Sequence, residues 1–266
     1  MAEEAGGGRG PSIGRVLRLA FDTIAAQPFL TLGLAFLVAA LPSRVMDYGM
    51  RWAEPLIQGR LSTGGRVSAY LAMAFVATAL SSIGQAALVA PVWCRAMNRR
   101  AGFGESLRAM FAVLPTVVVV SFIFDAVAAL GFAALVVPGI IAICAWAVAV
   151  PVLVAEQCGP IEALRRSAYL TRHARWNVFA LLVIDFAVAL LIGLVSKRLL
   201  LLVPDSWTTL GQWIFGIDVP LVPYLITCLI QMVTVAMFGS MWNALYIELR
   251  DWKDGPPRDT LAEVFA

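Results

Sequence analysis

Long apolar stretches recur along this chain, and short polar segments separate them. Six of them reach about 20 residues, the length that a helix needs to cross the roughly 30 Å hydrocarbon core of a membrane. They lie at 28–46, 69–92, 116–136, 139–155, 176–196 and 221–246. The pattern predicts an all-α, polytopic membrane protein with six transmembrane helices.

The third and fourth stretches follow one another with almost no polar residue between them. Pro138 and Gly139 stand at this junction. Proline cannot continue a helix, and glycine accepts the backbone angles of a tight reversal. We therefore expect an antiparallel hairpin whose turn lies at these two residues.

Three of the polar segments carry apolar residues at helical spacing. The clearest is 13–24, where apolar residues recur at i, i+3, i+4, i+7, i+8 and i+11, while Arg15 and Arg18 fall on the other side. Segments 103–114 and 161–168 repeat this pattern ahead of the third and fifth spans. We expect three amphipathic helices at the cytoplasmic surface of the membrane.

These three segments also resemble one another in sequence, with LRLAF at 17–21, LRAMF at 107–111 and LRRSAY at 164–169. Each precedes two spans, which predicts three repeats of amphipathic helix plus hairpin, at about 12–102, 103–159 and 160–255. The alternative is that any arginine-rich helix before a span looks alike. On either interpretation, 12–255 is one membrane domain, residues 1–11 form a disordered tail, and 256–266 form a cytoplasmic tail.

The composition agrees with this class and indicates an orientation. Hydrophobic residues make up 61% of the chain and charged residues 14%, against about 45–50% and 25% in soluble domains, which excludes a soluble protein. The net charge of +3 is small and the basic residues are scattered, so we expect no nucleic acid partner.

The segments on the N-terminal side of the membrane hold 14 of the 20 lysines and arginines, and the positive-inside rule then predicts that both termini are cytoplasmic.

Four polar side chains stand inside the predicted spans. Asp125 and Asp185 lie near the middle of the third and fifth spans, and Gln85 and Gln231 lie in the second and sixth. An ionised carboxylate at that depth costs at least about 2.5 kcal/mol, so neither aspartate should face lipid. In a functional role, these side chains form a proton or cation relay, or a polar site for a headgroup. In a structural role, they join neighbouring helices through hydrogen bonds.

A second set of charges follows the fourth span. Glu156, Glu162, Arg165 and Arg166 flank a Gly-Pro pair at 159–160. They form either a salt-bridged collar or a site for the headgroups of anionic lipids, which clustered arginines attract. The chain contains no nucleophile elbow, phosphate-binding loop or metal-binding motif, so we predict no catalytic residue, no metal and no cofactor.

Several motifs resemble a known membrane family: VPGII at 137–141, PVLVAE at 151–156, PIEALRRS at 160–167, LT at 170–171 and YIELR at 246–250. They are similar to the membrane domain attached to bacterial glycerophosphoryl diester phosphodiesterases and to YciC-like inner-membrane proteins. In those diesterases catalysis belongs to a separate soluble barrel that needs paired histidines, whereas His173 is the only histidine here. The resemblance implies a membrane module of the bacterial inner membrane without the hydrolase.

Taken together, these features predict a non-enzymatic bacterial inner-membrane module that binds or organises lipids or a partner membrane protein, or that forms a homo-oligomer. The competing hypothesis is a small proton- or cation-coupled transporter that uses Asp125 and Asp185. A third possibility is an intramembrane enzyme acting on lipids, which the pair of carboxylates keeps open.

Overall fold

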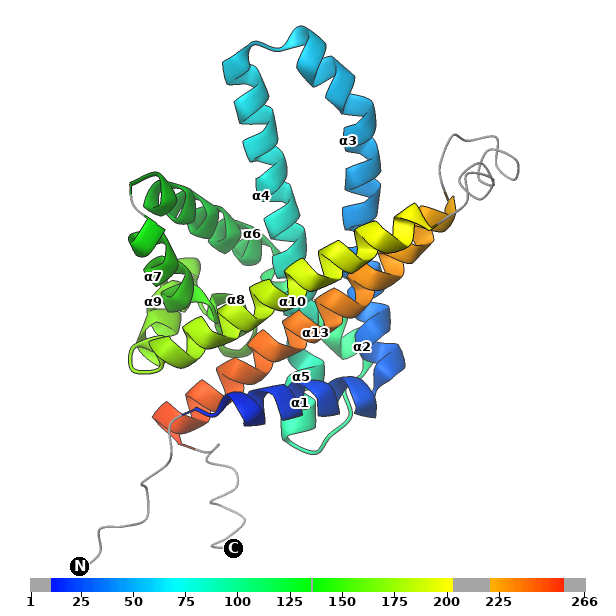
Figure 1. Ribbon diagram of the computed structural model, residues 1–266. Helices are drawn as coiled ribbons and strands as arrows, with labels where there is room; N and C mark the ends of the chain where they lie inside the picture. Colours follow the sequence, from blue (N-terminus) through cyan, green and yellow to red (C-terminus); the bar gives the residue numbers. More distant parts are fainter. Residues whose placement is uncertain (1–10, 135, 203–220, 256–266) are drawn as a thin grey trace, which may run out of the picture.

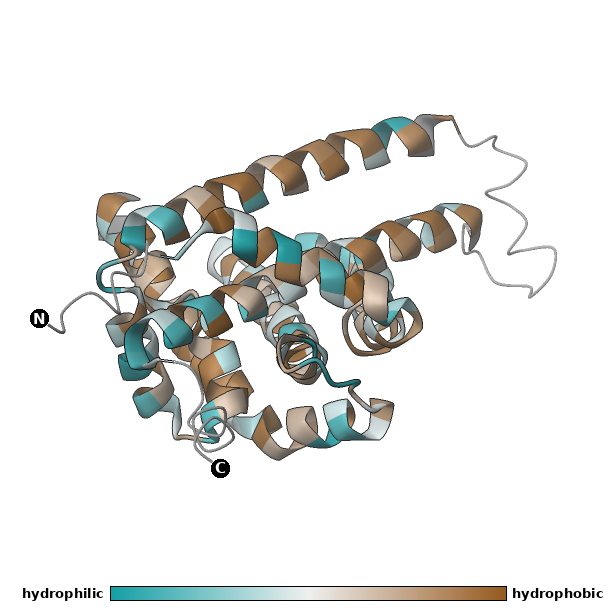
Figure 2. Ribbon diagram, turned by 90° about the horizontal axis from the view of Figure 1, so that it is seen from below, coloured by the Kyte–Doolittle hydropathy of each residue, from teal (hydrophilic) through white to brown (hydrophobic). Residues whose placement is uncertain are grey.

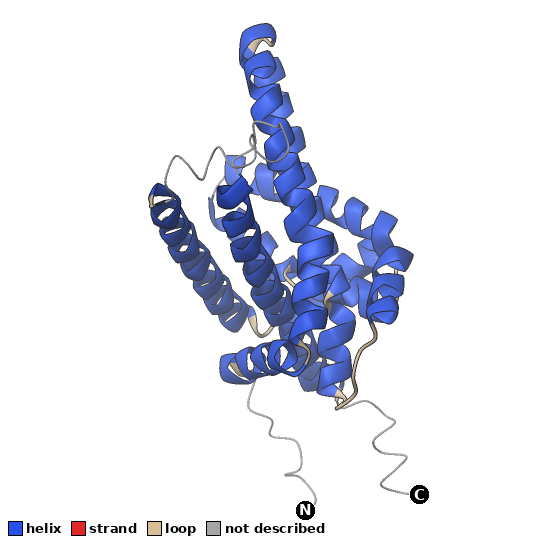
Figure 3. Ribbon diagram, turned by 90° about the vertical axis from the view of Figure 1, so that its right-hand side faces the viewer, coloured by secondary structure: helices blue, strands red, loops and turns tan. Residues whose placement is uncertain are grey.

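The computed structural model describes residues 11–134, 136–202 and 221–255. These residues form helices joined by short connections and contain no strand (Figure 3). Six helical segments are long and apolar enough to cross a membrane: Pro28–Met50, Thr63–Ala96, Phe103–Gly131, Val137–Glu156, Arg175–Leu199 and Val222–Asp254. The prediction of an all-α, multi-pass membrane protein with six spans is confirmed. Apart from Pro11, the predicted tails at 1–11 and 256–266 lie outside the described residues.

The first hairpin follows a short helix, α1 (Ile13–Ala26). Its helices, in chain order, are α2 (Pro28–Ala35), the π-helical turn η1 (Phe36–Ala40), α3 (Leu41–Arg60), α4 (Thr63–Ala87) and α5 (Val89–Ala96). The outer parts of α3 and α4 extend beyond the other helices (Figure 1).

The second and third hairpins complete the bundle. The second consists of α6 (Phe103–Ala134), α7 (Val136–Trp146) and α8 (Ala149–Glu156). The short helix α9 (Pro160–Thr171) then leads into α10 (Arg175–Leu201), which pairs with α13 (Leu221–Asp254). The two long helices run side by side in opposite directions (Figure 1), and apolar residues lie along both without one preferred side. Figure 2 shows their largely apolar surface from below. Helices that are apolar all round are typical of membrane spans.

Two of the three predicted amphipathic helices are separate helices, namely α1 and α9. The third is instead the first part of α6, which runs without a break through Pro115. No glycine, asparagine or aspartate lies between Glu105 and Pro115 to end the helix. Prolines are tolerated inside transmembrane helices. The expected boundary between an amphipathic segment and a span at 114–116 is therefore wrong.

The hairpin turn predicted at Pro138 and Gly139 is also misplaced. Helix α6 ends at Ala134 and α7 begins at Val136, so Pro138 and Gly139 lie in the first turn of α7. Proline fits there because the first turn of a helix has backbone N–H groups without intrahelical acceptors. Gly139 instead lets two helices approach, because a Cβ on Gly131 of α6 would lie 2.8 Å from its Cα.

The tightest packing lies at one end of the bundle, where α1, α5, α8, α9 and the last turns of α13 meet. The residues of α8 from Ala149 to Val154 are all buried. Tyr246 of α13 is 1% exposed, and its ring stacks on that of Trp93 of α5. This end of the molecule, formed by α1, α5, α8, α9 and the last turns of α13, is rich in arginine. We call it the basic face.

Both ends of the described chain reach the basic face. The backbone N–H of Ser12, the N-cap of α1, donates a hydrogen bond to Oε1 of Glu248, 3.2 Å away on α13. Arg15 of α1 pairs with the same carboxylate. A chain with six spans ends on the same side of the membrane as it begins, and the contact between α1 and α13 agrees with this. The division of the chain into three repeats of amphipathic helix plus hairpin stays a prediction.

Candidate functional site

A cavity of about 390 Å³ lies within the bundle where the three hairpins meet. It is lined by Thr78, Ser82, Gln85, Val120, Ser121, Phe124, Ile143, Trp146, Ala147, Ala149, Val150, Leu182, Asp185, Phe186, Ala189 and Trp242. Asp185 is the eleventh residue of α10, about 15 Å from the start of that helix at a rise of 1.5 Å per residue. The cavity therefore reaches the middle part of this long apolar helix.

The cavity opens toward the lipid-facing surface along α10. Phe186 lines it and yet is 68% exposed, and Ala189, one turn further, is also exposed. In a helix of this kind an exposed residue faces the hydrocarbon of the membrane. A molecule dissolved in the bilayer can thus enter the cavity directly from the membrane, through this lateral opening.

Polar atoms inside the cavity lack hydrogen-bond partners within the described part of the chain. They are Nε2 of Gln85, Oγ of Ser121 and Oδ1 of Asp185, and all three are buried. The backbone of Gln85 is fixed, because its carbonyl accepts a hydrogen bond of 3.1 Å from Nδ2 of Asn243. A buried polar group without a partner costs about 1–3 kcal/mol, so the cavity favours a ligand or water molecules with matching donors and acceptors.

The two intramembrane carboxylates lie at different places relative to the cavity. Asp185 lines it, and the indole of Trp242 approaches this carboxylate as a hydrogen-bond donor. Asp125 is not a lining residue, but it lies near Thr78, which is one and whose hydroxyl donates a hydrogen bond of 3.0 Å to the backbone carbonyl of Ala74. Oδ2 of Asp125 is likewise buried without a partner among the described residues. Thr78 thus lies between the cavity and the second carboxylate.

A smaller cavity of about 200 Å³ lies between α1, α10 and α13. Its lining is apolar throughout: Leu17, Ala20, Phe21, Ile24, Ile184, Val188, Met237, Phe238 and Met241. Such a cavity can accept hydrocarbon but offers no hydrogen bond. The two cavities therefore differ in chemistry, and α10 contributes to both.

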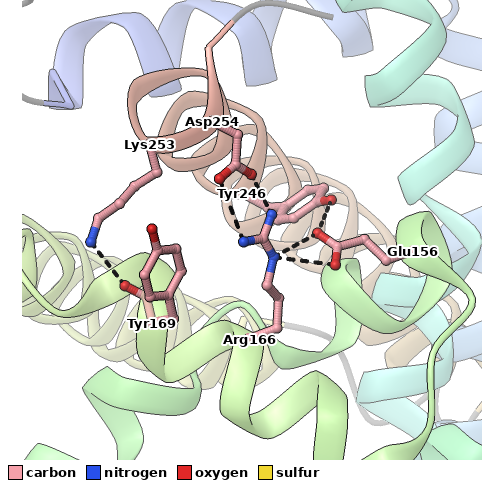
Figure 4. A network of polar contacts seen from close by, with 6 residues as sticks. All are labelled: Glu156, Arg166, Tyr169, Tyr246, Lys253 and Asp254. Carbon is pink, nitrogen blue, oxygen red and sulfur yellow. Dashed lines mark hydrogen bonds and ion pairs between the residues drawn. The ribbon is translucent and has the colours of Figure 1, made fainter.

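An ion-paired network occupies the basic face (Figure 4). Nε of Arg166 donates to both oxygens of Glu156, at 3.1 and 3.2 Å, and the guanidinium also pairs with Asp254. The hydroxyl of Tyr246 donates a hydrogen bond of 3.2 Å to Glu156. Burial alone would lower the pKa of Arg166, but the bonds to Asp254 and Glu156 outweigh it and raise that pKa. Arg166 therefore joins α8, α9 and α13 as a permanent cation.

A second link joins the same helices. Nζ of Lys253 donates a hydrogen bond of 3.0 Å to the backbone carbonyl of Tyr169 and lies 4.6 Å from the centre of its ring. The network thus connects the end of α13 to Arg166 and Tyr169, in the second half of α9. Glu162 and Arg165 take no part in it, and both side chains are exposed.

Comparisons of this chain with protein-family models, with curated proteins and with solved structures found no match. They do not bear on the resemblance to the membrane domain of the diesterases, which stays a prediction from the motifs at 137–171.

The structure brings together only some of the residues that the sequence singled out. Gln85 and Asp185 share the cavity, Asp125 adjoins it through Thr78, and Gln231 is half-buried on α13 away from it. At the basic face, Glu156 and Arg166 are paired. No group of three or more potential metal ligands occurs among the described residues.

Sequence reasoning missed most of the cavity lining. One signal was present, because Thr78, Ser82 and Gln85 stand at i, i+4 and i+7 and so form a polar stripe on one face of α4. Nothing in the sequence marks Ser121, Trp146 or Trp242 as neighbours of that stripe.

Proposed function

We propose that this protein is a non-enzymatic module of the bacterial inner membrane, and that it binds a lipid or lipid-like amphiphile with the headgroup in the larger cavity. The observation that carries the proposal is the combination of buried, unpartnered polar atoms with a lateral opening beside Phe186. A headgroup satisfies those atoms, and its hydrocarbon chain stays in the membrane.

The lining suits this type of ligand. Ser121, Gln85 and Asp185 supply donors and acceptors, whereas most other lining residues are apolar. Small-molecule sites commonly have this composition, with an apolar wall and a few polar groups that orient the ligand. The smaller, apolar cavity along α10 offers room for hydrocarbon. Both termini are cytoplasmic in this proposal, because that orientation places the basic face on the inside.

Native mass spectrometry of protein extracted gently into nanodiscs tests the proposal. Ala189→Phe fills the opening of the cavity, and Ala187→Phe is its matched control, since Ala187 is exposed on α10 but does not line the cavity. We expect a lipid adduct on the wild type and on Ala187→Phe, and about a tenfold lower occupancy on Ala189→Phe. The proposal would be refuted if the two variants showed equal occupancy of the lipid adduct, or if the wild-type chain carried no lipid.

A small proton- or cation-coupled transporter is the second candidate. The observation that favours it is the position of Asp185 in the lining of the cavity and of Asp125 near Thr78, another lining residue. Intramembrane carboxylates in such series are typical of proton pathways. In liposomes, a transporter would show ion flux that both Asp125→Asn and Asp185→Asn abolish, whereas a binding module would show no flux in the wild type.

A further inference from the structure

We propose that the group held in the larger cavity is a positively charged ammonium. This inference rests on the proposed function, because it names the chemical class of ligand for the same site. Its basis is the juxtaposition of a carboxylate with four aromatic rings in a membrane-embedded cavity that has no basic side chain in its described lining.

The carboxylate provides the charge that selects the ligand. Asp185 lines the cavity, and its Oδ1 is buried and lacks a hydrogen-bond partner among the described residues. Asp125 adds a second carboxylate behind Thr78. An ionised carboxylate at this depth is stable only with a cationic partner. The described lining offers no lysine, arginine or histidine for that role. Without a ligand the carboxyl is kept neutral by a proton, and a cationic ligand takes the place of that proton.

The aromatic rings recognise the same type of group. Phe124, Trp146, Phe186 and Trp242 line the cavity, and they come from four different helices, α6, α7, α10 and α13. The face of an aromatic ring carries negative electrostatic potential and attracts a cation, and sites made of several rings are the usual means of binding quaternary ammonium groups. The rings therefore favour an ammonium over a metal ion, which prefers oxygen ligands.

The same lining disfavours anionic groups. A phosphate in the cavity would meet the charge of Asp185 without any basic side chain to compensate it. Donors are limited to neutral groups such as Nε2 of Gln85, Oγ of Ser121 and the Trp242 indole. An amphiphile that carries an ammonium headgroup without a phosphate fits this lining, because its hydrocarbon chain alone passes through the apolar opening at Phe186.

The test uses purified full-length protein in a nonionic detergent. The tryptophan fluorescence, to which the cavity residues Trp146 and Trp242 contribute, is followed during titration with dodecyltrimethylammonium. An uncharged dodecyl ether and tetramethylammonium are titrated in parallel. We expect the cationic amphiphile to bind about tenfold more tightly than the uncharged one, a difference of about 1.4 kcal/mol.

Three variants identify the source of this preference. Asp185→Asn keeps the shape of the side chain but removes its charge, and we expect it to abolish the preference for the cation. Asp22→Asn is the control, because Asp22 is an exposed carboxylate on α1. Ala189→Phe should weaken both amphiphiles.

The outcomes separate this inference from the proposed function. If the wild type binds both amphiphiles equally and Ala189→Phe weakens both, the ammonium inference is wrong and the proposed function stands. If neither amphiphile binds the wild type, or Ala189→Phe changes nothing, both are wrong. Tight binding of tetramethylammonium that Asp185→Asn abolishes would support the ammonium and would assign it to a small solute instead of a lipid.

Discussion

Gly84 of α4 marks a close contact within the first hairpin, which α13 also approaches. A Cβ at this position would lie 2.6 Å from Cβ of Ala39 and 3.4 Å from Cγ1 of Val235. Ala39 belongs to the π-helical turn η1 and is 1% exposed, and Val235 belongs to α13. Gly84→Ala therefore forces three helices apart.

The magnitude follows from that distance. Two carbon atoms attract best at about 3.5–4.0 Å, so the new methyl group lies about 1 Å too close. Overpacking of this kind costs about 1–3 kcal/mol, while alanine gains up to about 1 kcal/mol over glycine in helix propensity. We expect Gly84→Ala to lower the free energy of unfolding by up to about 2 kcal/mol. Gly33→Ala has nothing within 4 Å of its Cβ and should be neutral or stabilising.

Reversible unfolding in mixed micelles of a mild detergent and dodecyl sulfate measures this difference. The decisive variant combines Gly84→Ala with Ala39→Gly, which moves the methyl group from one helix to the other. The nearest Ala39 atom is then its Cα, 3.9 Å away, an ordinary contact, and the propensity terms cancel. We expect the double variant to recover wild-type stability. If Gly84→Ala is as stable as Gly33→Ala, or if Ala39→Gly fails to rescue it, the helix contact described above is wrong.

Three further predictions concern the basic face and the topology. Arg166→Ala should lower the unfolding free energy by about 1 kcal/mol, since solvent screens its half-buried pairs with Glu156 and Asp254. Arg165→Ala should change it little. Equal losses of stability for the two variants in a melting experiment would contradict the network. Ser167 and Thr171 both donate to the carbonyl of Ala145, at 2.9 and 3.2 Å. Ser167→Ala should therefore lower the free energy of unfolding by about 0.5–1.5 kcal/mol. Combined with Thr171→Val, it should lower it by more than the two single losses together, because the carbonyl then has neither donor. Reporter fusions should place both termini in the cytoplasm, and a periplasmic signal from either fusion would reverse the proposed orientation.

The bond from Ser167 to Ala145 shows why the helix boundaries were hard to predict. Ala145 lies in the last turn of α7, where backbone carbonyls lack intrahelical partners. Side chains of α9 satisfy this carbonyl, so the break between α7 and α8 is stabilised from a distant part of the chain. Pro151, in the first turn of α8, is the one feature between 139 and 155 that is compatible with such a break; the rest of this apolar stretch reads as one continuous span.

The sequence by itself determined the six spans, the helices α1 and α9, and the presence of carboxylates and amides at membrane depth. These features depend on the hydropathy of neighbouring residues, which follows directly from their order. The tertiary structure decided which of the polar residues meet. It placed Gln85 and Asp185 in the lining of one cavity, left Gln231 apart, and paired Arg166 with a carboxylate 88 positions away. Helices that are apolar on every side carry no pattern that fixes which side faces the interior, so only their packing assembled the cavity.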